Sequence, residues 1–267
     1  MSISIEFEGL HNVRDLGGMP AAGASVKPGV LFRGDQLFFA TESDRSKVDE
    51  LGIRTVIDFR SAPERAEKPD PDIPGVRNLH LPVIQDVRAG IAHDSESNAS
   101  MVKMIAQGAD IDRSLVDTYM QKMYAGFVEG AEASEQYGRF FDEVVLAAER
   151  GEALFWHCTA GKDRAGFATV VVLEALGVAR DDIFDDYLET NARLSAVVEQ
   201  LIATVGRMLP SEGARDAARR FFRADASYLV AAYETADRLY GSFDAYLERA
   251  LGVDAGKRKS LRCALLE

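Results

Sequence analysis

The segment from His157 to Gly166, with the sequence His-Cys-Thr-Ala-Gly-Lys-Asp-Arg-Ala-Gly, constrains the fold of this chain more than any other. It follows a short apolar run, Ala153 to His157, that is typical of a buried strand. It leads into Thr169 to Leu176, an almost wholly apolar stretch that is typical of a buried helix and ends at Gly177. A strand, a tight loop and a helix in this order favour an α/β fold.

The rest of the chain predicts a layered α/β architecture with a helical second half. Further strands are expected at 31–33, 55–59 and 76–83. Further helices are expected at 46–51, 115–128, 134–150, 181–205, 215–222, 227–239 and 242–251. Residues 85–110 are polar without a clear period, which indicates a loop with a short helix near 101–105. We therefore expect a central, mostly parallel sheet flanked by helices, in one domain that spans residues 1–267.

Composition narrows the range of functions. The net charge of -12 argues against duplex nucleic acid as a partner and against stable association with an anionic membrane. No apolar run is long enough for a membrane span, and the N-terminus does not resemble a signal peptide, so we expect a cytoplasmic protein and leave export without a signal open. Two cysteines, Cys158 and Cys263, and four scattered histidines predict neither a disulfide framework nor a zinc site, and no metal or cofactor is expected.

The loop between Cys158 and Arg164 carries the most specific chemistry. A helix N-terminus and a nearby arginine both favour the thiolate form of a cysteine, which is the nucleophilic form. Consecutive loop amides can surround a tetrahedral anion, and the planar guanidinium of Arg164 can bind two of its oxygens. A lone buried cysteine would be structural, whereas this spacing predicts a phosphocysteine-forming phosphate monoester hydrolase. The expected phosphate-binding residues are Thr159, Ala160, Gly161, Lys162, Asp163 and Arg164.

The loop and several other segments resemble the bacterial protein tyrosine phosphatase family, as represented by the mycobacterial protein tyrosine phosphatase B. The similar segments, beside the loop itself, lie at 12–18, 28–34, 58–61, 185–191 and 233–246. The resemblance covers nearly the whole chain. It implies the three-layer protein-tyrosine-phosphatase fold with a helical lid over the active site, here at about 181–223. The implied substrates are phosphotyrosine proteins or small phosphate monoesters, with phosphoserine, phosphothreonine and phosphoinositides as further possibilities.

Hydrolysis also requires a general acid that protonates the leaving oxygen. Three carboxylates are candidates: Asp86, Asp58 and Asp163. The resemblance favours Asp86, since the acid of the family follows a segment similar to the one that precedes this residue. One extra residue in this chain leaves the register open, and the alternative is a solvated loop acid. Asp58 is expected to orient the loop or Arg60, and Asp163 to hydrogen-bond within the loop.

Other charged residues have two interpretations each. In the family, and in lipid phosphatases with a related loop, a lysine at the position of Lys162 is associated with phosphoinositide recognition; the alternative is a solvated loop lysine. Arg14, Asp15, Arg33 and Arg60 either line the pocket or form buried ion pairs, and we slightly prefer ion pairs.

Ala165 departs from the family pattern, in which threonine or serine commonly follows the loop arginine. That hydroxyl usually hydrogen-bonds the leaving thiolate, so its absence predicts slower breakdown of a phosphocysteine, unless Thr159 compensates. It also keeps open a catalytically impaired module that binds phosphorylated ligands. A third possibility is another enzyme class with a Cys-to-Arg loop, such as a rhodanese-like sulfurtransferase or an arsenate reductase.

Overall fold

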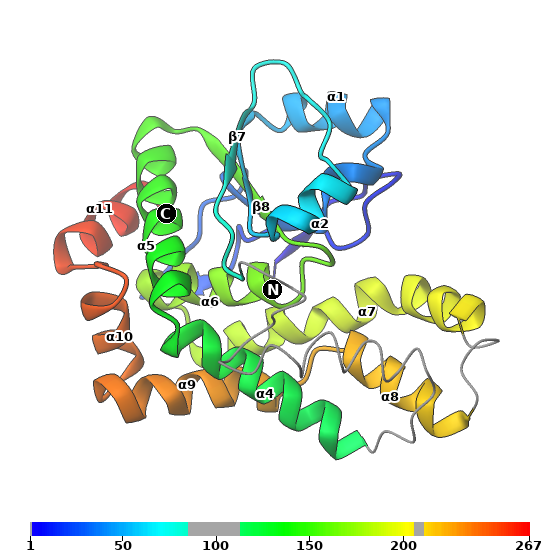
Figure 1. The fold of residues 1–267 in the computed structure, drawn as a ribbon. Coiled ribbons are helices and arrows are strands. Elements are labelled where there is room, and N and C mark those ends of the chain that lie inside the picture. The colour runs from blue at the N-terminus through cyan, green and yellow to red at the C-terminus, as the bar shows by residue number, and fades with distance from the viewer. Residues whose placement is uncertain (1, 85–112, 206–210) are drawn as a thin grey trace.

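The computed structural model describes residues 2–84, 113–205 and 211–267, and its centre is a mixed sheet (Figure 1). The strand order is β1-β2-β5-β8-β6-β7. The four strands from β5 to β7 are parallel, and β1 and β2 add antiparallel pairs at one edge. The strands are β1 (Ile3–Ser4), β2 (Arg14–Asp15), β5 (Leu31–Gly34), β8 (Ala153–His157), β6 (Ile53–Asp58) and β7 (Arg77–His80). A separate two-stranded pair joins β3 (Pro20–Ala21) to β4 (Ala24–Ser25).

Strand β8 lies at the centre of the parallel part and is buried along its whole length. Its last residue, His157, pairs with Gly34 of β5 on one side and with Asp58 of β6 on the other. Three parallel strands therefore end together, and the loop that begins at Cys158 leaves the sheet at this common carboxyl edge. Ligands of open α/β sheets bind at such edges.

Alternate residues of the strands enter two hydrophobic cores on opposite faces of the sheet. Val56 and Phe155 face the smaller core, which includes Val48 of α1 (Glu42–Glu50). Ile57 and Trp156 face the larger core, which is formed with the C-terminal helices. The sheet is thus the middle of three layers, and the predicted fold is confirmed.

The helical half packs against the face of the larger core (Figure 1). Its centre is a cluster of aromatic side chains that includes Phe127, Tyr137 and Phe167, with ring centroids about 5 to 6 Å apart. The helices are α4 (Arg113–Glu129), α5 (Ala131–Arg150), α6 (Arg164–Leu176), α7 (Arg180–Val205), α8 (Glu212–Phe222), α9 (Ala226–Tyr240), α10 (Phe243–Arg249) and α11 (Ala255–Leu265). None of the helices in the described parts of the chain is long and apolar enough to cross a membrane.

Residues that begin or end a helix predicted several of these elements. Thr41 caps α1 through a capping box with Asp44, and Gly151 ends α5 in the left-handed conformation at φ 66°. The sequence did not predict α2 (Ala62–Glu67) or the two-residue strands, because a short helix or strand presents too few residues for a period. It did not predict α11 either, whose buried residues are few. The loop expected at 85–110, with its short helix, lies wholly outside the described residues.

Candidate active site

The loop from Cys158 to Arg164 joins the end of β8 directly to the start of α6. Cys158 is 2% exposed, and Arg164 is the first residue of the helix. Gly161 has φ +68°, and a Cβ atom there would lie 2.3 Å from the carbonyl oxygen of Gly34. The loop can therefore turn this closely over the end of β5 only with glycine at this position.

Three consecutive carbonyl groups of the loop accept hydrogen bonds from neighbouring elements. The Asn12 side chain donates to Ala160 O at 2.9 Å, the Arg33 guanidinium to Gly161 O at 2.6 Å, and the Gln36 amide to Thr159 O at 3.2 Å. In a planar trans peptide the N–H group points opposite to the carbonyl group. The amides of residues 160, 161 and 162 therefore point to the other side of the loop, and no acceptor among the described residues binds them.

Arg164 is held by Glu64, a residue that the sequence analysis did not select. Nη1 of the arginine donates to Glu64 Oε2 at 2.6 Å and Nη2 to Oε1 at 2.9 Å, while Thr159 Oγ1 also donates to Oε1 at 2.7 Å. Burial by itself raises the pKa of Glu64, but the bonds from Arg164 outweigh it and lower the pKa to about 2. The capping box of Ser61 with Glu64, which follows the Asp-Phe-Arg segment directly, was the signal that could have revealed α2 and this carboxylate.

The charged residues of the N-terminal segments form buried ion pairs. Arg14 Nε lies 2.9 Å from Asp186 Oδ1, and Arg33 Nη1 lies 2.9 Å from Asp186 Oδ2, with all three side chains at most 1% exposed. Burial, and then the neighbouring Arg14, lower the pKa of Arg33 to about 10. Asp15 instead accepts the amides of Gly17 and Gly29 in nearby turns. Arg33 thus links α7, which carries Asp186, to the loop carbonyl of Gly161.

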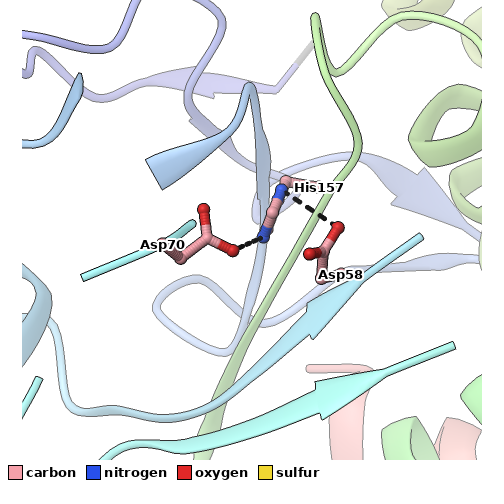
Figure 2. Close-up of side chains that lie close together, drawn as sticks. All are labelled: Asp58, Asp70 and His157. Atoms are coloured by element: carbon pink, nitrogen blue, oxygen red, sulfur yellow. Dashed lines mark ion pairs between the residues drawn. The ribbon is translucent and has the colours of Figure 1, made fainter. Parts of the chain in front are cut away.

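His157, Asp58 and Asp70 form a second charged cluster beneath the loop, with the imidazole between the two carboxylates (Figure 2). Arg60 donates to both oxygens of Asp58, at 2.9 and 2.8 Å, and to Asp70 Oδ2 at 2.7 Å. Burial lowers the pKa of His157, but Asp58 and Asp70 outweigh it and raise the pKa overall. A metal ion on these carboxylates would have to displace the guanidinium, so the cluster does not fit a metal site. The cluster contacts the loop through His157, whose Nδ1 atom lies 3.0 Å from the carbonyl oxygen of Cys158.

Lys162 is buried, and its ammonium group points to the C-terminal end of α8. Nζ donates to Phe221 O at 2.6 Å and to Arg223 O at 3.2 Å, and lies 3.5 Å from Asp163 Oδ1. A solvated loop lysine is therefore excluded. The burial lowers the pKa of Lys162. Asp163 accepts a hydrogen bond from Tyr124 at 2.8 Å.

The structure thus brings the loop residues together with Asp58 and Arg60. Arg14 does not contact the loop itself but binds Asn12, which donates to the loop carbonyl of Ala160. Asp86, the preferred general acid, lies outside the described residues. Asn12, Gln36, Glu64 and Asp70 complete the surroundings of the loop, and none of them was selected from the sequence.

Comparison with known proteins agrees with this geometry. The sequence profile of the tyrosine phosphatase family matches residues 5–267. A predicted tyrosine-protein phosphatase of Cupriavidus necator is 33% identical over 95% of this chain and 86% of its own length. The triple specificity protein phosphatase PtpB of Mycobacterium tuberculosis is 31% identical over 98% of both chains. Among solved structures, a kinase associated phosphatase aligns with 72% of this chain and 84% of its own, at 12% identity and a TM-score of 0.35, too low to bear on the site. With the profile matched along nearly its whole length, the chain belongs to the tyrosine phosphatase family.

Proposed function

We propose that this chain hydrolyses phosphate monoesters, foremost phosphotyrosine in proteins, through a phosphocysteine at Cys158. The observation that supports this most directly is the set of three loop carbonyls bound from outside, which leaves the amides of residues 160, 161 and 162 for an anion. Together with the guanidinium of Arg164 they form a preorganised set of donors for the oxygens of a transferring phosphoryl group.

The proposed reaction has two steps. The Cys158 thiolate attacks phosphorus, an S–P bond forms, and the P–O bond to the substrate breaks as a carboxylic acid protonates the leaving oxygen. Water then attacks phosphorus, the carboxylate takes its proton, and the S–P bond breaks to release phosphate and the thiolate. Asp86 is proposed as the acid. Asp163 is already bound to the Tyr124 hydroxyl, which makes it the weaker candidate.

The breadth of substrates is part of the proposal. The relative PtpB is named a triple specificity protein phosphatase, which supports activity on more than one class of phosphate monoester. For phosphoinositides, the support from Lys162 is weaker than its sequence position suggests, because its ammonium group is engaged by two carbonyls of the α8 end. A panel of phosphopeptides and phosphoinositide vesicles would rank these substrates.

The test of the central claim uses the two cysteines. Cys158→Ser is expected to abolish turnover of 4-nitrophenyl phosphate, whereas Cys263→Ser, at an exposed position, is expected to leave it unchanged. Rapid acid quenching followed by mass spectrometry should find one phosphoryl group on the peptide that contains Cys158. Full activity of Cys158→Ser would refute the mechanism, and binding of phosphopeptides by an inactive wild type would indicate a binding module.

A further inference from the structure

Two adjacent phenylalanines lie exposed beside the phosphate loop. They follow Leu37 in a short 3-10 helix, Leu37–Phe39, whose first side chain is buried in the smaller core while Phe38 and Phe39 are 41% and 52% exposed. Their rings pack edge to face with centroids 5.0 Å apart. Aromatic side chains that gather on a surface are characteristic of interaction sites rather than of solvated surface.

The backbone fixes this pair relative to the loop. The amide of Gln36 donates to Thr159 O, and the amide of Leu37 donates to Asp70 Oδ1 at 3.0 Å. Consecutive Cα atoms are about 3.8 Å apart, so Phe38 begins within about 8 Å of the residue that contacts the loop. The contact with Thr159 holds the rings beside the loop, and the bond from Leu37 to Asp70 holds them near α2, whose Glu64 binds Arg164.

A lysine completes the patch. The ammonium group of Lys68 lies 5.6 Å from the centre of the Phe39 ring, and the Lys68 carbonyl accepts a bond from Arg60 at 2.7 Å. Within the described parts of the chain, no carboxylate forms an ion pair with this ammonium group. A cation without an ion-pair partner among the described residues, placed on an aromatic surface, favours a ligand that is both acidic and apolar.

We propose that Phe38, Phe39 and Lys68 form a docking surface for the polypeptide next to the phosphorylated residue of a protein substrate. The segment that fits it carries an apolar or aromatic side chain beside an acidic one. An anionic membrane fits less well, because membrane-binding surfaces use clusters of several basic residues and this surface offers one lysine. The inference rests on the proposed phosphatase function and specifies its substrate class.

The test compares two kinds of substrate on matched variants. For a phosphotyrosine peptide flanked by leucine and glutamate, we expect the double variant Phe38→Ala/Phe39→Ala to raise KM about tenfold with kcat unchanged. Turnover of 4-nitrophenyl phosphate, which has no flanking chain, should stay within about twofold of wild type. The control is Val230→Ala/Leu239→Ala, which removes two side chains of similar exposure, 40% and 46%, from α9.

The charge is tested separately. Lys68→Glu should reverse the preference between peptides with glutamate and with lysine beside the leucine, without changing aryl phosphate turnover. Equal losses of kcat/KM on the peptide and on the aryl phosphate would overturn the docking surface. Unchanged peptide kinetics in both the Phe38→Ala/Phe39→Ala variant and Lys68→Glu would also overturn it. A loss confined to phosphoinositide vesicles would overturn it in favour of a membrane contact. A wild type that is inactive on aryl phosphate as well would refute the proposed function itself.

Discussion

Glu64 and Arg164 face each other in a two-point ion pair, in which each oxygen of the carboxylate accepts from a different terminal nitrogen of the guanidinium. Both side chains are largely buried, at 21% and 11% exposure. Such a paired geometry fixes the plane of an arginine as well as its position. Because Thr159 donates to the same carboxylate, Glu64 orients both ends of the Cys158–Arg164 loop.

The first prediction follows from this pair. Glu64→Gln replaces one acceptor oxygen by an amide group that cannot accept, so Arg164 loses a charged hydrogen bond worth about 1.5–3 kcal/mol. We expect kcat/KM for 4-nitrophenyl phosphate to fall about ten- to a hundredfold. Glu67→Gln, at an exposed position of the same helix, is the control and should have no effect. Equal activity of the two variants would show that Glu64 does not position the arginine.

The same pair predicts a pH dependence of stability. The pKa of Glu64 in the folded chain is about 2, below its ordinary value of 4.5, so its stabilising contribution is complete above pH 4.5 and is lost as the pH falls toward 2. The difference in the free energy of unfolding between wild type and Glu64→Gln should therefore be larger at about pH 6 than at about pH 3. Urea titrations at both values would measure it, and a constant difference would contradict the assignment.

Asp186 is expected to be a major determinant of stability. Asp186→Asn would leave Arg14 and Arg33 buried without a carboxylate, and breaking a buried pair in this way destabilises a protein by about 3–5 kcal/mol. Asp185→Asn, the exposed neighbour on the same helix, should be nearly neutral. Chemical denaturation would compare the two variants, and similar midpoints would indicate that the cluster contributes no net stability.

Ala165 predicts a kinetic signature. The residue is fully buried, and its carbonyl accepts from Thr169 at 2.9 Å, but it has no hydroxyl to stabilise a leaving thiolate. We expect wild type to release a burst of nitrophenol before a slower steady state, and Ala165→Ser to reduce the burst and raise the steady rate about tenfold. Ala168→Ser, buried in the next turn of α6, is the control. Absence of a burst in wild type would contradict slow breakdown of the intermediate.

The sequence alone predicted those parts of the candidate site whose residues lie close together along the chain. Cys158 and Arg164 were predictable because one strand end, one glycine turn and one helix start fix their relation within a few residues. The capping box of Ser61 could have placed Glu64 on a helix, but its contact with Arg164 was not predictable, because the two residues lie 100 positions apart and nothing in a single sequence reports such a contact. The helix α11 was missed for another reason: its buried residues, Leu261 and Leu265, are too few among its basic side chains to produce a clear period.

The placement of Lys162 makes this residue a reporter of whether α8 stays packed against the loop. Its amine is enclosed between the Cys158–Arg164 loop and the carbonyls of the α8 end, where reagents that acylate free amines have no access. Only a conformation in which α8 has separated from the loop would present this nitrogen to solvent. The rate at which Lys162 becomes acylated, relative to an exposed lysine, would thus measure how often α8 separates from the loop, if it does so at all in solution.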